Sequence, residues 1–149
     1  MLNPDFRDML SDLNDAGAEF LVVGAYALAA YGMPRATGDI DIWVRPTESN
    51  AQNVWAALEA FGAPRSGVSA ADFAQQDVVF QIGVAPGRID ILTSITGVEF
   101  DAAWDAREQI EVDGINLFVL SREHLIRNKR ATGRAKDLAD VAWLESPNG

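Results

Sequence analysis

Cysteine is absent from this sequence, and histidine occurs once, at His124. Without cysteine the chain has no disulfide framework and no thiolate metal site, and its composition neither requires nor excludes an oxidising compartment. A single histidine cannot form a zinc cluster, and we expect no histidine-based catalytic triad. We therefore place His124 on the surface of the protein.

Long apolar runs are missing as well. No stretch approaches the about 18 residues that a membrane span needs, and no basic and apolar leader opens the chain. We therefore expect a soluble, cytoplasmic protein without membrane contact. The chain has 149 residues, which is the size of one domain, so we expect residues 1–149 to form a single domain.

Positive charge is scarce: 12 Lys and Arg stand against 22 Asp and Glu, for a net charge of −10. This balance argues against general coating of nucleic acid, whose affinity comes mainly from basic side chains. Half of the basic residues nevertheless lie between Arg122 and Lys136, where Glu123 is the only acid. That interval carries +5 and the rest of the chain −15, so a polyanion could be received locally.

The stretch from Glu19 to Pro46 holds the residues with the clearest chemistry. Phe20–Val23 is an apolar run that predicts a strand, and it stops at Gly24. The helix formers of Ala25–Tyr31 follow directly, so a helix begins where the strand ends. The first N–H groups of such a helix have no partner within it and attract phosphate, and a glycine lets the phosphate approach closely.

Asp39 to Val44 alternates between acidic and apolar residues with period 2. Asp39 and Asp41 therefore share one face of a strand and the isoleucines the other. Two close carboxylates resist joint ionisation unless a cation lies between them, and oxygen ligands beside a phosphate suit Mg²⁺. Asp90 lies in a third apolar strand, 88–92, and completes the cluster if this strand pairs beside the first. Taken alone, an Asp-x-Asp pattern favours another interpretation, the solvent-exposed face of an antiparallel sheet.

With Gly24, Arg35 and Thr37 added, the sequence resembles a known family. The pattern Gly-Ala-x-Ala-Leu-x-x-x-Gly-x-x-Arg-x-Thr-x-Asp-Ile-Asp-x-x-Val runs from Gly24 to Val44. It is similar to the nucleotidyltransferase superfamily of DNA polymerase beta-like transferases, and in particular to its small bacterial members of the abortive-infection and toxin–antitoxin type. The family usually has Gly-Gly or Gly-Ser at Gly24-Ala25, so a hydroxyl contact to the nucleotide is lost here, whereas backbone N–H donors remain.

The resemblance implies an Mg²⁺-dependent (or Mn²⁺-dependent) transfer of a nucleoside monophosphate from a nucleoside triphosphate to an acceptor hydroxyl. The acceptor is an RNA end, a protein or a small molecule, and a cognate partner protein of a toxin–antitoxin pair is implied too. Asp39, Asp41 and Asp90 are then both the metal ligands and the catalytic residues. The implied nucleotide-binding residues are Gly24, Ala25, Arg35, Thr37, Lys129, Arg134 and Lys136.

Two other interpretations remain open. The chain could be a nucleotide-binding or protein-interaction module on the same fold that transfers nothing, which Gly24-Ala25 favours and the intact carboxylates oppose. It could also be a plain α/β domain with incidental acids. For the basic tail, an ion-paired couple of exposed helices with Lys136 and Asp140 at i and i+4 is as good an interpretation as phosphate binding.

The whole pattern predicts an α/β (α+β) fold, in which a small mixed central sheet carries packed helices. The resemblance implies a nucleotidyltransferase-like core over about residues 17–120, followed by C-terminal helices over about residues 121–146. The expected helices are Asn3–Ala16, one capped by Ser49 or Asn50 and ending at Phe61, Glu99–Ala106, Arg122–Thr132 and Ala135–Leu144 with an inward stripe of Leu138, Val141 and Leu144. The remaining expected strands are Val78–Val84 and Arg88–Ser94, joined by a turn, then Gln109–Val112 and Ile115–Leu120, with Arg65–Gln76 as a loop.

Overall fold

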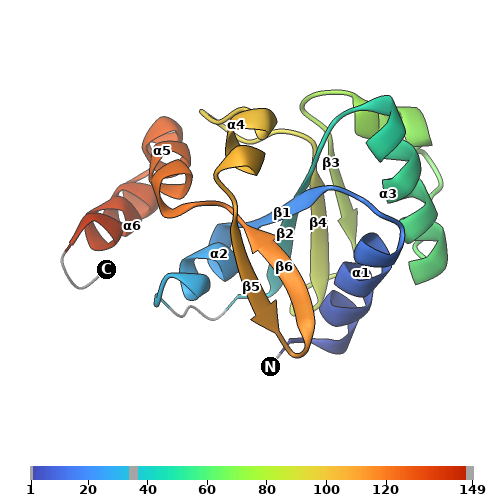
Figure 1. The fold of residues 1–149 in the computed structure, drawn as a ribbon, viewed down its shortest axis with the longest axis horizontal. Coiled ribbons are helices and arrows are strands. Elements are labelled where there is room, and N and C mark those ends of the chain that lie inside the picture. The colour runs from blue at the N-terminus through green and yellow to red at the C-terminus, as the bar shows by residue number, and fades with distance from the viewer. Residues whose placement is uncertain (1, 34–36, 147–149) are drawn as a thin grey trace.

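The computed structural model describes residues 2–33 and 37–146. A mixed sheet of six strands lies at the centre, and helices cover both of its faces (Figure 1). This agrees with the α/β class expected from the sequence. In chain order the elements are α1 (Pro4–Asp15), β1 (Phe20–Val23), α2 (Gly24–Ala30), β2 (Asp39–Val44), α3 (Glu48–Phe61), a 3₁₀ helix (Ala70–Ala74), β3 (Val79–Ile82), β4 (Arg88–Leu92), α4 (Phe100–Asp105), β5 (Glu108–Val112), β6 (Ile115–Val119), α5 (Arg122–Thr132) and α6 (Ala135–Glu145).

The strand order is β3-β4-β2-β1-β6-β5. β2 runs parallel to β4, and β1 runs parallel to β6. The other three neighbouring pairs, β1 with β2, β3 with β4 and β5 with β6, are antiparallel. As a result the end of β1 lies beside the start of β2, and the start of β4 lies on the other side of β2. Residues at these three positions therefore lie at the same end of the sheet.

One face of the sheet is covered by α1 and α3. Ile40, Ile42 and Val44 of β2 point to this side, as their alternation with the aspartates predicts. Helix α1 packs on them through residues spaced at i, i+3, i+4 and i+7, which is the spacing of one helix face. These residues are Phe6, Met9, Leu10 and Leu13, all buried.

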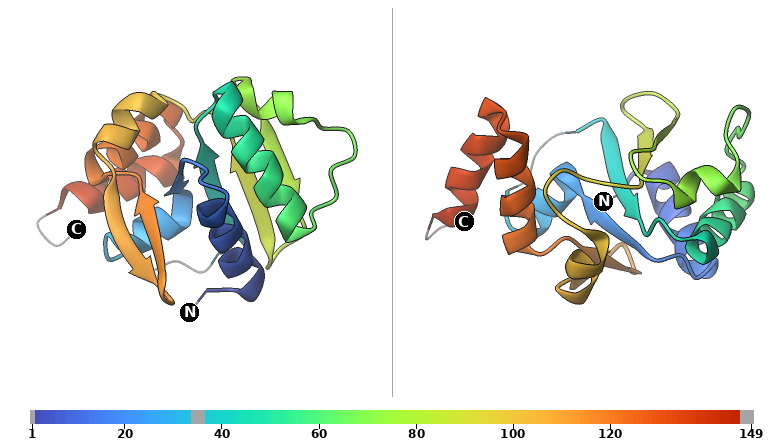
Figure 2. Two further views of the ribbon diagram at one scale, coloured as in Figure 1. Left: turned by 45° about the vertical axis from the view of Figure 1, so that its right-hand side comes forward. Right: turned by 90° about the horizontal axis from the view of Figure 1, so that it is seen from above.

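The opposite face is covered only in part. Trp43 of β2 is buried here, edge-on to Phe100 of α4 at a ring-centroid distance of 5.0 Å. Leu125 of α5 and Leu144 of α6 belong to the same apolar cluster. Both views in Figure 2 place α5 and α6 at the end of the molecule away from α3. Trp43 is thus a packing residue. The helices on this face leave the part of β2 and β4 that carries the carboxylates uncovered.

Two local expectations around α3 are corrected. Thr47, not Ser49 or Asn50, caps this helix by accepting a hydrogen bond from the Asn50 backbone N–H. Asn50 is instead buried, where its side chain bonds to both backbone groups of Glu19. The segment expected as a loop contains the 3₁₀ helix, because Ser69 and Asp72 form a capping box there and Phe73 is fully buried.

The C-terminal helices differ from expectation in three ways. His124 is buried, with only 8% of its surface exposed, and the next residue, Leu125, belongs to an apolar cluster with Leu21 and Val23 of β1. Leu138 is 46% exposed, so it does not belong to the inward stripe of α6. The stripe is rotated because Asp137 and Asp140 point inward and form ion pairs with Lys129, and the expected pair of Lys136 with Asp140 is replaced by this contact.

None of the helices in the described ranges is both long and apolar enough to cross a bilayer.

Candidate active site

Four side chains form a two-by-two array on the open face of β2 and β4. The parallel register pairs Asp41 with Asp90 and Asp39 with Arg88. Partners in neighbouring strands point to the same face, and residues two apart in one strand do so too. The fold therefore brings together acids that are separated by about fifty positions in the sequence.

The three carboxylates converge as expected from the sequence. Each of Asp39, Asp41 and Asp90 offers one oxygen, and these oxygens lie within 4.8 Å of one another. Carboxylate oxygens are the hard donors that Mg²⁺ and Mn²⁺ accept, and two or three of them at this spacing leave further positions for phosphate or water. The donor set therefore fits a divalent metal ion.

Gly24 lies directly against this cluster. Its φ is +69°, and a Cβ placed on it would come within 2.3 Å of Oδ2 of Asp41. The register explains the closeness, because Val23, the last residue of β1, pairs with Asp41. Gly24 is also the first residue of α2, so strand, glycine turn and helix follow one another as the sequence predicted, and only glycine fits between them.

Comparison with solved structures finds the same architecture elsewhere. A predicted nucleotidyltransferase from Thermotoga maritima matches with a TM-score of 0.60 and 20% identity, over 97% of this chain and 95% of that one. The antibiotic-resistance factor ANT(2″)-Ia matches with a TM-score of 0.62 and 14% identity, over 94% and 80%. An antigenic nucleotidyltransferase-like protein from Paracoccidioides brasiliensis matches with a TM-score of 0.57 and 17% identity, over 94% and 74%. The chain has the nucleotidyltransferase fold. No protein-family model and no curated protein matches the sequence.

Among the residues that the structure describes, Arg88 is the one cation bonded to the carboxylates of the array. Its Nη2 donates to Oδ2 of Asp39 at 2.8 Å and to Oδ2 of Asp90 at 3.2 Å, and its Nε donates to Oδ1 of Asp90 at 3.1 Å. The sequence reasoning missed Arg88. The signal was present, because Arg88 precedes Asp90 by two residues and must share its face.

The environment of the aspartates separates their pKa values. Burial raises the pKa of Asp41 to about 7, and the neighbouring charges of Asp39 and Asp90 add to this. Burial also acts on Asp39, but hydrogen bonds from Thr37 and Arg88 outweigh it and hold the pKa of Asp39 below its usual value. At a pH near 7 Asp41 therefore carries a proton for part of the time when no metal is bound, as expected for a buried carboxyl group beside other carboxylates.

The remaining residues expected near the nucleotide differ in how close they lie to the array. Thr37 lies next to the array, and its Oγ1 donates to Oδ1 of Asp39 at 2.8 Å. Ala25 is the second residue of α2. Arg35 lies outside the described residues.

The basic tail residues lie on α5 and at the start of α6. Lys129 is buried and its Nζ lies 3.2 Å from Asp137 and 3.0 Å from Asp140. Arg134 also pairs with Asp137, at 2.8 Å, although 76% of its side chain is exposed. Lys136 is exposed. Much of the positive charge counted in the sequence is thus used between the two helices, which leaves a smaller basic surface than expected.

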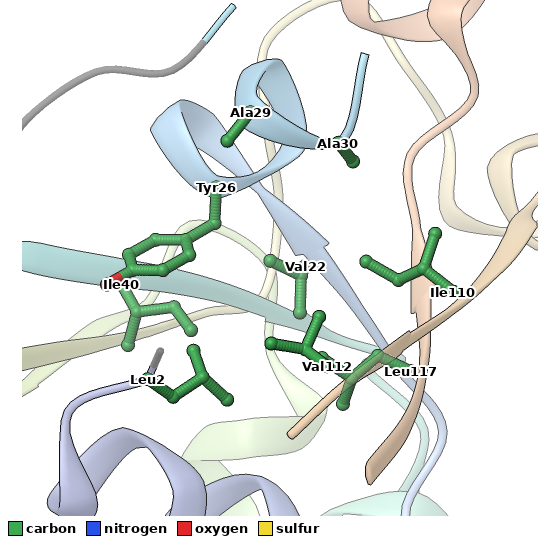
Figure 3. Close-up of a pocket in the computed structure, with 9 residues that line it drawn as sticks. All are labelled: Leu2, Val22, Tyr26, Ala29, Ala30, Ile40, Ile110, Val112 and Leu117. Atoms are coloured by element: carbon green, nitrogen blue, oxygen red, sulfur yellow. The ribbon is translucent and has the colours of Figure 1, made fainter. Parts of the chain in front are cut away.

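An apolar cavity of about 220 Å³ lies under α2, on the α1 side of the sheet (Figure 3). Tyr26 forms part of its wall, and burial together with the charge of Asp39 raises the pKa of this tyrosine. The other lining residues are aliphatic, so the cavity offers no metal ligand. They are Leu2, Val22, Ala29, Ala30, Ile40, Ile110, Val112 and Leu117.

Proposed function

We propose that this chain is a nucleotidyltransferase, which moves a nucleoside monophosphate from a nucleoside triphosphate to a hydroxyl group of an acceptor. The observation that carries the proposal is the convergence of Asp39, Asp41 and Asp90 within 4.8 Å beside the Gly24 turn. The likeness to solved nucleotidyltransferase folds supports the same reaction. Three carboxylates suit a reaction in which entering and leaving oxygens both carry negative charge.

The triphosphate binds with its outer phosphates at the Gly24 turn. The first N–H groups of α2, including that of Ala25, have no partner within the helix and can donate to phosphate oxygens. Thr37 keeps Asp39 oriented through its hydrogen bond. Arg35, Arg134 and Lys136 are the further phosphate ligands of this proposal, and Lys129 supports the last two by holding α5 against α6.

Asp39, Asp41 and Asp90 would hold a divalent metal, Mg²⁺ or Mn²⁺, which would supply positive charge to offset the negative charge of the phosphates. Asp90 also orients the acceptor. Asp90 takes the proton of the acceptor hydroxyl, whose oxygen attacks the α-phosphorus. A new P–O bond forms, the bond between the α-phosphorus and the bridging oxygen breaks, and pyrophosphate leaves with the electron pair.

The acceptor approaches Asp90 across β3. Gln81 of β3 pairs with Asp90 in the antiparallel register and therefore shares its face. Gln81 is exposed, as is Val79 on the same side of the strand, whereas Val23 and Trp43 on the other side of the array are buried. The open side of the site is thus the β3 side.

The class of the acceptor stays open among an RNA end, a protein and a small molecule. The tail's internal ion pairs weaken the case for RNA, because fewer free cations remain to displace counterions. The proposal of a partner protein, as in a toxin–antitoxin pair, rests on the sequence resemblance alone. Recovery of a protein as the labelled acceptor would support it.

The test uses a nucleoside triphosphate labelled at the α-phosphate or at the γ-phosphate, with Mg²⁺ and a cellular extract as the source of acceptor. We expect the α-label to enter the acceptor and the γ-label to leave in pyrophosphate. Asp90→Asn should lower transfer at least about a hundredfold, as for loss of a general base. Asp77→Asn is the matched control, since it makes the same charge change at an exposed position whose positive φ of 62° asparagine tolerates.

Three results would contradict the proposal. Transfer of the γ-label would make the chain a kinase, and equal transfer by Asp90→Asn and wild type would remove the third carboxylate from the reaction. Nucleotide binding without transfer of either label to RNA, protein or small molecules would favour the alternative of a binding module, to which Gly24-Ala25 already points.

A further inference from the structure

Arg88 is hydrogen-bonded to two of the three carboxylates that a divalent metal would need as ligands. Its guanidinium bridges Asp39 and Asp90 through three hydrogen bonds of 2.8 to 3.2 Å. The carboxylate oxygens of these two residues and of Asp41 are the metal-donor set, within 4.8 Å of one another. A dication placed among them would lie against the guanidinium, and two cations at such a distance repel strongly away from bulk water.

The Arg88 side chain can move away from the carboxylates into solvent, and it can bind phosphate at the same site. Its side chain is 36% exposed, whereas that of Asp90 is only 8% exposed. The Asp90 side chain is thus enclosed, while the arginine side chain reaches solvent on the open face. A guanidinium is charged at every working pH and binds phosphate through the same paired donors that it uses for carboxylate.

We propose that Arg88 is the resident cation of the metal-free site: a divalent metal displaces it from Asp39 and Asp90, and the released guanidinium then binds the phosphates of the nucleotide. This inference rests on the proposed function, because it assumes that metal and triphosphate meet at the array. It assigns Arg88 a role in binding that neither the carboxylate pattern nor the Gly24 turn supplies.

The exchange links the two ligands. Metal alone must break the Arg88 hydrogen bonds to the carboxylates, and only water replaces these acceptors, so metal binding is weakened. Metal together with triphosphate provides the guanidinium with new acceptors, so the same hydrogen bonds are re-formed on phosphate. Arg88 therefore disfavours metal without nucleotide and favours the loaded complex, which is a coupling between two ligands.

Replacing Arg88 should change two affinities in opposite directions. Binding of Mn²⁺ alone is measured at pH 8.5 from the electron paramagnetic resonance signal of the free ion. Arg88→Ala should bind Mn²⁺ about tenfold more tightly than wild type, since removal of a charge-assisted hydrogen bond to a carboxylate is of that order. Binding of a triphosphate analogue with an uncleavable α–β bridge, in saturating Mn²⁺, should become about tenfold weaker in the same variant.

Arg127→Ala is the matched control for net charge. Arg127 is a half-exposed arginine of α5 whose ion pair with Glu123 is long, at 3.8 Å, so its loss removes one positive charge without touching the array. Both of its affinities should stay within about twofold of wild type, because exposed charges at a distance are screened by salt. Arg88→Lys keeps the charge but loses the paired donors, and should fall between wild type and Arg88→Ala in both titrations.

A second measurement does not depend on the folding of any alanine variant. The Arg88 Nε–H resonance of wild-type protein, assigned by its absence in Arg88→Lys, should shift when Mg²⁺ is added and shift again when the triphosphate analogue follows. A resonance unchanged by saturating Mg²⁺ would overturn the proposal, as would weaker or unchanged Mn²⁺ binding by folded Arg88→Ala. These failures differ from failure of the proposed function, because label transfer that depends on Asp90 would persist in wild type.

Discussion

Gly24 and Asp41 lie in close contact, and each restricts what the other position can hold. The carboxylate of Asp41 fills the space where a Cβ of residue 24 would be, at 2.3 Å. The glycine also adopts a positive φ, which other residues take up only at a cost. Any side chain at position 24 must therefore displace a proposed metal ligand.

Gly24→Ala separates this contact from backbone strain. Gly17 also has a positive φ, +73°, but nothing lies within 4 Å of where its Cβ would be, so Gly17→Ala is the matched control. Both variants should lose about 1 kcal/mol of stability from the left-handed backbone. Only Gly24→Ala should also lose Mn²⁺ binding, by about tenfold or more, because Asp41 is moved. Equal metal affinities in the two variants, measured by titration, would mean that Asp41 is no ligand.

Single residues were predictable where a strand's alternation decides their direction. Asp39, Asp41 and Asp90 follow from period 2, and the same rule applied to Arg88 would have placed it among them. The predicted surface position of His124 was wrong, because the polarity of a single helical residue does not indicate which side of the helix packs against the protein. The alternation of side chains along a strand is therefore a stronger guide to a residue's position than the polarity of one side chain.

Helices α5 and α6 are joined by an ionic cluster around Lys129. Its ammonium contacts Asp137 and Asp140, and Asp137 also accepts hydrogen bonds from Thr132 and Arg134. Burial opposes ionisation of Asp137, but these donors outweigh it and lower its pKa to about 2. Because the pKa of Asp137 is lower in the folded state, its ionisation stabilises the fold at pH values above the unfolded pKa of about 4. This stabilisation is lost as the pH falls toward 2.

Asp137→Asn should therefore change the pH dependence of stability. At pH 6 the variant should be less stable than wild type by roughly 2 kcal/mol, which is the free energy of such a pKa difference. Between pH 4 and pH 2 wild type should lose this advantage, and the two curves should converge. Urea unfolding at several pH values measures this, with Asp8→Asn on the exposed side of α1 as control. Parallel curves over that range would show that Asp137 does not anchor the helices.

Element boundaries followed from the sequence where caps and breakers are explicit. Ser121 caps α5 and Gly133 ends it with a left-handed backbone, both as predicted. The inward side of α6 was wrong because hydrophobic periodicity assumes an apolar interface. Here two aspartates lie inward and satisfy a buried lysine, which no pattern of Leu138, Val141 and Leu144 reveals.

At the scale of the whole molecule, the order of the strands produces the site. β1 lies between β2 and β6 and delivers Gly24 to the starts of β2 and β4, while α1 and α3 cover the other face (Figure 1). The sequence predicted a mixed sheet with helices, and the solved structures share that fold. The pairing of β2 with β4 entered the sequence argument only as the condition under which Asp90 joins the cluster, because local periodicity cannot specify a long-range pairing. The structure meets this condition. That residues 1–149 form one domain stays a prediction.

A crystal structure with Mn²⁺ and the uncleavable triphosphate analogue tests the central claim most directly, because anomalous scattering locates manganese without reference to the protein atoms. We predict manganese in contact with carboxylate oxygens of Asp39, Asp41 and Asp90, with the outer phosphates at the Gly24 turn. Manganese and nucleotide bound elsewhere in crystals saturated with both, while these three carboxylates bind neither, would contradict the account.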